Sequence, residues 1–558
     1  MEKIWLKNYP KGVPAEIDLN DYASLAELFN ESCERFAEST AYISMGQHMS
    51  YAQLHESARR FAAWLQAQGA TRGTRVALMM PNILQYPVAL FGTLLAGCTV
   101  VNCNPLYTAR ELEHQLRDAQ AEFVVVVENF AHTLQDARAS LPDLKHVVVA
   151  TLGDMLGTLK GPILNLIVRH VKKMVPAWSL PGHIRFADIM KRTNANSFRP
   201  VSLNHSDMAF LQYTGGTTGV AKGAVLSHGN LVANLCQAYA WVKPHAKGNG
   251  KDFIVTALPL YHIFALTANC LTFVRLGATN LLILNPRDIP GFIKELRKYP
   301  FTAFTGVNTL FNALMNNAAF KSISFDNLML TLGGGMAVQR PVAERWKQMT
   351  GKPLTQAYGL TETSPAVTIN PLDLREFNGS IGLPVPSTDI SIRDDQGKEL
   401  GVNETGELCV RGPQVMQKYW NKEAETQKAF EPDGFLRTGD MGYINEDGYI
   451  FLVDRKKELI IVSGFNVYPS EIEEVVASHP SVSEVAAIGV DNGASGEVVK
   501  IVVVRKDPSL TEKTLIDFCR SELTGYKVPK VVEFRDELPK TPVGKILKRE
   551  LKQAPDRH

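Results

Sequence analysis

The chain has 558 residues, 45% of them apolar, and its 59 basic and 57 acidic side chains leave a formal charge of +2. This balanced composition excludes global disorder, a collagen-like repeat and a polybasic nucleic-acid tail, so we expect no nucleic-acid partner. At about 100–200 residues per domain, the length predicts several domains or one large α/β body with an appendage.

The cysteines and the N-terminal segment bear on the compartment. Seven cysteines, an odd number, are scattered without a CxxC pair, a pattern typical of buried thiols in a reducing cytosol. The segment 1–10 carries charges on both sides of its apolar residues and lacks the apolar run of a signal peptide. We therefore expect a cytoplasmic protein.

One uncharged stretch, 76–109, imitates a membrane span. Prolines and asparagines interrupt it, and its cleanest piece, 88–101, is shorter than the ~20 residues that a bilayer helix needs. The pattern favours a strand at 76–80, a buried helix at about 83–96 and a second strand at 99–102. This is the βαβ arrangement of a covered parallel sheet.

Further along the chain, helix signals alternate with β-branched runs. A Ser or Thr followed three positions later by Glu predicts helix starts at Ser24, Thr108, Ser470 and Ser509. Short apolar runs predict strands at 123–127, 146–150, 253–257, 281–284, 485–490 and 498–504. The alternation predicts an α/β fold.

The residue pattern changes from about 380 to 453, where turn-forming residues surround two predicted antiparallel strands, at 406–411 and 448–453. A charged cluster at 454–458 follows, and the remainder has its own β-α-β-β-α-β alternation. We predict a large N-terminal domain, 1–453, of parallel and mixed sheets with helices and a small β-barrel-like part. A hinge at 454–457 then leads to a small, mobile α+β C-terminal domain, 458–558.

The strongest local motif is the run 213–223, Tyr-Thr-Gly-Gly-Thr-Thr-Gly-Val-Ala-Lys-Gly. Glycines let successive backbone N–H groups point inward, and hydroxyls and a lysine add donors, so the run predicts a loop around an anion such as a triphosphate. It is not a Walker A loop, because Lys222 does not directly follow a glycine, and the chain contains no GxGxxG. The expected binding residues are Tyr213, Thr214, Gly215, Gly216, Thr217, Thr218, Gly219 and Lys222.

Several motifs together resemble the acyl-adenylate-forming (AMP-binding) superfamily, because they stand in its order. They are Thr-Gly-Gly-Thr-Thr-Gly at 214–219, Tyr-Gly-Leu-Thr-Glu at 358–362, Thr-Gly-Asp at 438–440, Asp-Arg-Lys-Lys at 454–457 and Pro-Val-Gly-Lys at 542–545. The segment 433–457 resembles the signature of fatty acyl-CoA synthetases, and nearly the whole chain resembles the bacterial long-chain fatty acid–CoA ligases. Phe435 stands where that signature usually has Trp, from which we expect only altered packing.

The resemblance implies an enzyme that activates a long-chain fatty acid with ATP as acyl-AMP, releases pyrophosphate and transfers the acyl group to CoA, for fatty acid uptake and β-oxidation. ATP and coenzyme A would be substrates, and Mg²⁺ the cofactor. Glu362 would be the Mg²⁺ ligand, since this cation prefers oxygen, and Thr214 would assist it. Tyr358 would lie against adenine, and the other expected nucleotide contacts are Gly334, Gly335, Gly359 and Thr361.

Other roles also follow from the resemblance. Asp440 would accept hydrogen bonds from the ribose hydroxyls, and Arg455 would donate to the same sugar. Lys545 would bridge carboxylate and phosphate, where its point charge suits negative charge spread over several oxygens. Lys545, Glu362 and Thr214 form the expected catalytic set, and Lys457 the hinge. The expected residues of the acyl site are His262, Phe264, Val307, Gly333 and Gly464.

Other functions stay open at this point. An acyl-AMP ligase that loads a carrier protein, a medium-chain or aryl acid–CoA ligase, and a luciferase-like oxygenase share the first step. A membrane-associated lipid carrier or sensor would bind without turnover. A homodimer is also open.

One segment, 156–178, belongs to none of these motifs. From 155 to 187 there is no acidic residue, but there are five bases, Lys160, Arg169, Lys172, Lys173 and Arg185. Apolar residues recur at helical spacing, namely Ile163, Leu166, Ile167, Val171, Met174, Val175 and Trp178. Such a helix could lie on anionic lipid at the inner face of the cytoplasmic membrane, or it could pack on the protein's own core with its bases in water.

Overall fold

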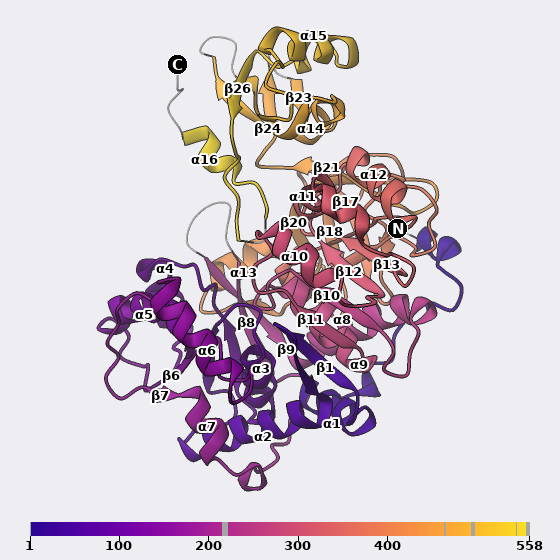
Figure 1. Ribbon diagram of the computed structural model, residues 1–558. Helices are drawn as coiled ribbons and strands as arrows, with labels where there is room; N and C mark the ends of the chain where they lie inside the picture. The colour runs from indigo at the N-terminus through magenta and orange to yellow at the C-terminus, as the bar shows by residue number, and fades with distance from the viewer. Residues whose placement is uncertain (1, 215–220, 463–464, 493–496, 543, 554–558) are drawn as a thin grey trace.

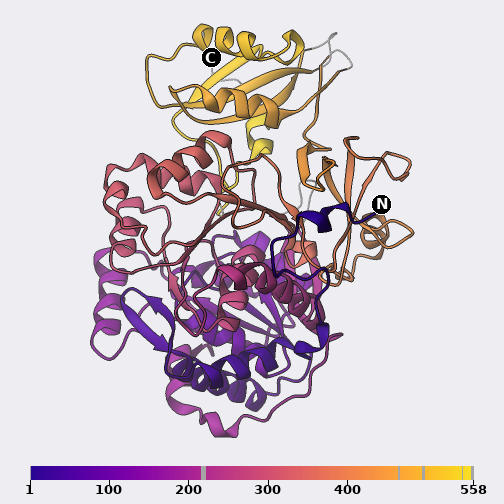
Figure 2. The same cartoon turned by 90° about the vertical axis from the view of Figure 1, so that its right-hand side faces the viewer.

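Two large sheets form most of the N-terminal body, and a smaller domain lies above it, coloured orange to yellow in Figure 1. The computed structural model describes residues 2–214, 221–462, 465–492, 497–542 and 544–553. Figure 2, turned by 90°, shows the small domain at the same end of the body. The predicted α/β fold with a large N-terminal and a small C-terminal part is confirmed.

The first sheet has eight strands in the order β19-β9-β8-β4-β3-β5-β6-β7. Six of these, β3 to β8, pair in parallel, whereas β9 and β19 are antiparallel. β-Branched runs such as Phe123–Val127 are buried throughout, as expected of a sheet covered on both faces. The strands are β3 (Arg75–Met79), β4 (Thr99–Asn102), β5 (Phe123–Val127), β6 (His146–Ala150), β7 (Ile184–Arg185), β8 (Met208–Thr214), β9 (Lys222–Ser227) and β19 (Lys418–Tyr419).

The uncharged stretch forms the predicted βαβ unit. Helix α3 (Gln85–Leu95) connects β3 to β4, and every one of its residues is buried. Over the described part of the chain, no helix is long and apolar enough to cross a membrane.

The second sheet has nine strands in the order β16-β15-β14-β13-β12-β10-β11-β1-β2. Its strands β10, β12, β13 and β14 are neighbours and parallel, so their carboxyl ends meet at one edge. The strands are β1 (Thr40–Ser44), β2 (Gln47–Ser50), β10 (Phe253–Thr256), β11 (Thr279–Leu282), β12 (Ala303–Gly306), β13 (Leu330–Gly333), β14 (Thr355–Gly359), β15 (Ala366–Ile369) and β16 (Leu383–Pro384).

Helices cover both sheets, and two of the four predicted helix starts are correct. Ser24 caps α1 and Thr108 caps α4, each accepting from the backbone N–H three residues on. The other two are wrong, because α14 begins with Pro469 at its first position and α15 is capped by Thr511. The helices of the body include α1 (Leu25–Arg35), α2 (Tyr51–Ala67), α4 (Ala109–Asp118), α5 (Ala131–Arg138), α6 (Lys160–Leu166), α7 (Phe186–Arg192), α8 (His228–Val242), α9 (Thr272–Arg275), α10 (Ile289–Leu296), α11 (Asn308–Asn316), α12 (Arg340–Thr350) and α13 (Glu423–Ala429).

The part predicted as β-barrel-like is an antiparallel sheet of four strands in the order β17-β18-β20-β21, with β17 and β21 at its edges. These are β17 (Asp389–Arg393), β18 (Gly406–Arg411), β20 (Leu436–Ile444) and β21 (Ile450–Arg455). Because β21 extends to Arg455, Asp454 and Arg455 belong to this sheet, and the chain turns after it, at 456–458.

The small domain has its own core, to which Ile472, Val485, Ile501 and Leu515 belong. Its elements are β22 (Ile460–Val462), β23 (Phe465–Val467), α14 (Pro469–Ser478), β24 (Val482–Asp491), β25 (Glu497–Arg505), α15 (Glu512–Glu522), β26 (Val531–Arg535) and α16 (Lys548–Gln553). All seven cysteines of the chain are buried free thiols, as predicted.

Candidate active site

The site begins at the carboxyl ends of four parallel strands. Val307 follows β12, Gly334 and Gly335 follow β13, and Tyr358 lies near the end of β14. The loop with His262 and Phe264 follows β10. Ligands of open α/β sheets bind beyond the carboxyl ends of the strands, so the topology alone gathers these predicted residues at a binding edge.

Asp440 links this edge to the four-stranded sheet. The hydroxyl of Tyr358 donates to Asp440 Oδ2 over 2.6 Å, and Arg455 Nε lies 3.3 Å from Asp440 Oδ1. Asp440 on β20 and Arg455 on β21 are cross-strand partners, which explains how residues fifteen positions apart meet. Asp440 is 5% exposed, and this burial raises the pKa of its carboxyl, against the opposing charge of Arg455.

Lys545 comes to the same place from the small domain. The yellow loop before α16 reaches down to the body in Figure 1, where the hydroxyl of Thr309 donates to the carbonyl of Gly544 over 3.1 Å. Gly544 has φ +85°, and a Cβ there would lie 2.9 Å from Thr309 Oγ1, so both the conformation and the close approach favour glycine. Burial and the charge of Arg455 lower the pKa of Lys545 to about 8, while Glu458 and Asp440 oppose this shift.

His262 is neutral at pH 7. Burial, followed by the positive charge of Lys545, lowers its pKa to about 4. The backbone N–H of Phe264 donates to His262 Nδ1 over 3.3 Å, which places the ring proton on Nε2. His262 therefore offers one N–H donor to a group beyond the ring.

Gly334 and Gly335 lie close to Phe264 and Val307, near the loop that carries this histidine. A Cβ on Gly334 would lie 3.1 Å from the ring of Phe264, and one on Gly335 would lie 3.7 Å from Val307 Cγ1. Gly333 instead faces Val338, 2.6 Å from where its Cβ would be, so it serves packing of the core. Gly464, also predicted for the acyl site, lies outside the described residues.

Glu362 has the properties of a Mg²⁺ ligand. It lies on the short helix η9 (Thr361–Thr363), which follows β14 and packs against β8, the strand that ends at Thr214. Its Oε1 accepts from the hydroxyl of Tyr419 over 2.7 Å, and no described Lys or Arg lies within ion-pair distance of it. Half-buried carboxylate and hydroxyl oxygens fit a hard cation that keeps several waters.

Two residues of the glycine-rich run have partners of their own. The hydroxyl of Tyr213 donates to Asp118 Oδ2 on α4 over 2.6 Å, so this side chain is engaged in the body's core. Lys222 Nζ lies 3.0 Å from Glu425 on α13 and 4.6 Å above the ring of Tyr419. Residues 215–219 lie outside the described part of the chain.

Some residues at the site were not predicted. Glu458 follows the predicted hinge directly, so its place beside that motif was a usable signal. Thr309 and Tyr419 stand in no motif, and only the fold brings them to Gly544 and Glu362. Two predicted residues support the turn after β14: Thr361 begins η9, and a Cβ on Gly359 would lie 2.0 Å from the carbonyl oxygen of Pro365, so the backbones touch there.

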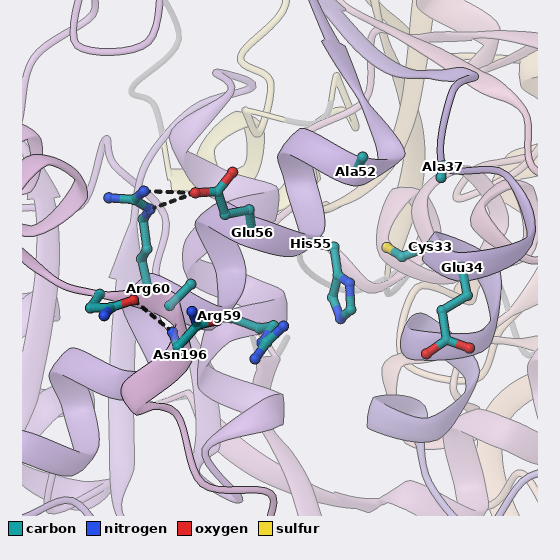
Figure 3. A pocket seen from close by; sticks show the side chains of 11 residues that line it. Cys33, Glu34, Ala37, Ala52, His55, Glu56, Arg59, Arg60 and Asn196 are labelled. Carbon is teal, nitrogen blue, oxygen red and sulfur yellow. Dashed lines mark hydrogen bonds and ion pairs between the residues drawn. The ribbon is translucent and has the colours of Figure 1, made fainter.

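A separate cavity of about 410 Å³ opens between α1, α2 and the 3₁₀ turn η5 (Ala195–Ser197) (Figure 3). Its lining includes Cys33, His55, Arg59 and Arg60, none of which was predicted for the site. The guanidinium of Arg60 lies 2.6 Å from Glu56 Oε1, so this charge is already paired. We assign it no part in the chemistry.

The chain is similar to known proteins over nearly their full length. The family model described as AMP-binding enzyme matches residues 29–420, and that of the AMP-binding enzyme C-terminal domain matches residues 471–545. The chain is 56% identical to a long-chain-fatty-acid–CoA ligase of Escherichia coli O157:H7, over 99% of this chain and 98% of the relative. It is 37% identical to the protein of the same name in Bacillus subtilis, again over 99% and 98%.

Among solved structures, ATP-bound MatB from Rhodopseudomonas palustris superposes with a TM-score of 0.81 at 28% identity, over 95% of this chain and 98% of the other. The two family matches together cover most of the chain, and they include Tyr358 on β14 and Lys545 in the loop before α16. The chain belongs to the AMP-binding enzyme family.

Proposed function

We propose that the protein is an ATP-dependent long-chain fatty acid–CoA ligase. The meeting of Lys545, Asp440, Arg455 and His262 at one edge carries this proposal, together with the full-length similarity to long-chain ligases. A fatty acid carboxylate attacks the α-phosphorus of ATP, and the bond to pyrophosphate breaks. The thiol of CoA, losing its proton, then attacks the acyl carbon, and AMP leaves.

In the first step, His262 would donate its Nε2 proton in a hydrogen bond to one carboxylate oxygen of the fatty acid. Lys545 would lie between that carboxylate and the α-phosphate, where negative charge is spread over several oxygens in the transition state. Asp440 and Arg455, already fixed to each other and to Tyr358, would hold the ribose. Phe264, Val307 and the glycines at 334 and 335 would leave room for the acyl chain.

The run 213–223 would surround the phosphates with N–H and hydroxyl donors, with Lys222 turning from Glu425 to them. Glu362 and Thr214 would hold Mg²⁺, which neutralises charge on the phosphate oxygens when bound. Tyr358 would offer its ring to adenine.

The two steps need different surroundings at one carbon. We propose that the domain 458–558 rotates about Lys457 between them, which removes Lys545 and admits CoA. The turn directly after the last strand of the body, in which Lys457 is exposed, supports this position of the hinge.

The proposed function is tested by pyrophosphate release across C2 to C18 acids, with and without CoA. We expect the highest specificity constants for long-chain acids and stoichiometric acyl-CoA. A preference for aryl or medium-chain acids, or a demand for a carrier protein in place of CoA, would support those alternatives. Light emission with O₂ would indicate an oxygenase, and no pyrophosphate with any acid would indicate a carrier or sensor.

The pKa of Lys545 predicts a pH dependence. Since only the protonated amine stabilises the transition state, the specificity constant of adenylation, which reports the free enzyme, should fall as the pH rises through about 8. Glu458 raises the pKa of Lys545, so Glu458→Gln should move this falling limb to lower pH. Single-turnover pyrophosphate release between pH 6.5 and 9.5 measures it, and identical profiles for both enzymes would contradict the assignment.

Removing the Glu362 carboxylate, the proposed Mg²⁺ ligand, should raise the Mg²⁺ concentration that adenylation requires. Glu362→Gln keeps the size of the side chain but removes its charge, so we expect the half-saturating Mg²⁺ concentration to rise by at least about tenfold. A Mg²⁺ titration of the adenylation rate measures this. Tyr419→Phe, which removes only the hydroxyl that binds Glu362, is the matched control and should shift the titration less.

We also propose that the enzyme is cytoplasmic and meets its poorly soluble substrate at the inner face of the cytoplasmic membrane. The basic segment 156–178 supports this location. Light scattering decides whether the enzyme is a monomer or a homodimer.

A further inference from the structure

Within the segment 156–178, residues 160–171 form a continuous helical rod on the surface of the body. Helix α6 continues directly into the π-helical turn η4 (Ile167–Val171). The rod lies beyond the carboxyl ends of β5 and β6, on the loop after β6 and on the short helix η3 (Glu128–Phe130). In Figure 1, α6 lies on the body, far from the small domain.

Polar side chains attach this rod to the protein. Asn165 accepts from the backbone N–H of Gly153 over 2.9 Å and donates to Thr151 Oγ1 over 2.8 Å. Arg169 forms an ion pair of 2.6 Å with Glu128, whose side chain is only 2% exposed. The inward face is therefore held by directional polar bonds, with Val168 as a buried apolar member.

Close backbone contact fixes the same face inward. A Cβ added to Gly161 would lie 2.2 Å from the carbonyl oxygen of Gly153, and the reverse distance is also 2.2 Å. This approach is possible only because both residues are glycines. Rotation of the rod would lose this packing and the bonds of Asn165 and Arg169 together.

As a result, the apolar side chains point outward. This is the reverse of a surface helix in a globular protein, whose apolar stripe faces the core. Eleven large apolar side chains are markedly exposed among the described residues, and six of them belong to this one segment. They form the α6–η4 face: Leu159 (79% exposed), Ile163 (60%), Leu166 (59%), Ile167 (37%), Val171 (66%) and Met174 (56%).

Of the two sequence interpretations, packing on the protein's own core is wrong for this face; only Val175 and Trp178 are half-buried.

The charges beside the α6–η4 face are positive. Lys172 and Lys173 are exposed, and no described carboxylate lies within ion-pair distance of either. The chain has no acidic residue from 155 to 187. Arg169 is neutralised by Glu128, whereas Lys160 donates to the backbone carbonyl of Met45 and keeps its charge. Lys172 and Lys173 add two further uncompensated charges just beyond the end of the rod. Apolar side chains beside free lysines complement an interface of acyl chains and anionic headgroups.

We propose that the α6–η4 face docks on a membrane that contains anionic lipid, with Lys172 and Lys173 at the headgroups. This inference rests on the proposed function, because docking would bring the enzyme to a fatty acid that partitions into the membrane. The rod lies on the bilayer and does not cross it. Because the small domain lies away from α6, at the top of the view in Figure 1, it stays free to rotate while the face is docked.

The test is co-sedimentation of the full-length protein with vesicles of phosphatidylglycerol and phosphatidylcholine, compared with phosphatidylcholine alone. We expect binding to the anionic vesicles that weakens with salt. Lys172→Glu/Lys173→Glu should reduce it by about tenfold or more. Lys321→Glu/Lys347→Glu, which changes the same charge at two exposed lysines elsewhere on the body, should not reduce it.

The apolar contribution is tested in the same way. Ile163→Ser/Val171→Ser should abolish most vesicle binding, whereas Met329→Ser/Val402→Ser, at other exposed apolar positions, should not. Thermal melting and pyrophosphate release with soluble octanoate show that each variant is folded.

The proposal would be overturned if the wild-type protein did not bind the vesicles. It would also be overturned if vesicle binding did not depend on salt, on lipid charge or on either pair of substitutions. A dimer in light scattering that Ile163→Ser/Val171→Ser dissolves would overturn it as well. Vesicle binding does not require turnover, so an enzyme that docks but activates no long-chain acid would contradict the proposed function alone.

Discussion

Lys545→Ala is expected to lower the rate of adenylation by about 10²–10³-fold, the scale of lost electrostatic contacts in a transition state. The side chain lies within electrostatic reach of Asp440 and Arg455, and its charge would serve the first step only. Transfer of the acyl group from supplied acyl-AMP to CoA should therefore continue at nearly the wild-type rate. Pyrophosphate release and thioester formation, measured separately, compare the two steps.

Lys552→Ala is the matched control for this experiment. Lys552 also lies near the end of the chain, on α16, but its side chain is exposed. Its removal should change neither half-reaction. An equal loss of both half-reactions in Lys545→Ala would show that the lysine supports the structure of the small domain and does not serve adenylation.

Lys457→Pro is expected to have the opposite effect. Proline fixes φ near −65° and also restricts the residue before it, so a turn that must adopt two conformations would be held in one. In the structure, Lys545 already lies near Asp440 and Arg455, where we propose that adenylation takes place. Acyl-AMP should therefore still form, while its transfer to CoA should fail.

Lys457→Ala leaves the backbone free and should transfer the acyl group normally, because the Lys457 side chain is exposed. Rapid-quench analysis of bound acyl-AMP, followed by addition of CoA, distinguishes the two variants. Wild-type turnover in Lys457→Pro would place the hinge at another residue.

The sequence predicts helices and strands correctly where the residues within the element determine its conformation. The uncharged stretch 76–109 folds as a buried strand, helix and strand, because its length is too short for a membrane and its β-branched runs suit a covered sheet. The order of the motifs likewise predicts correctly that Asp440, Arg455 and Tyr358 lie close together. The contacts between them depend on the pairing of β20 with β21.

Long-range partners decide what could not be predicted. Helical periodicity separates two faces of the segment 156–178 but cannot say which one meets the protein. That choice depends on contacts of the segment with Glu128 and Gly153, and the ion pair between Arg169 and Glu128 joins residues 41 positions apart. Tyr213 shows the same limit, since its place in a glycine-rich motif gives no sign of the hydrogen bond to Asp118.

The lowered pKa of Lys545 also makes substrate binding a proton-linked event. With a pKa of about 8, a fraction of this amine is neutral in mildly alkaline solution. A bound polyanion favours the ammonium form, so its arrival must draw a proton from the solvent. By reciprocity, the affinity for that anion rises as the proton concentration rises. Calorimetric titrations of ATP near pH 8 in buffers of different ionisation enthalpy would count the protons taken up.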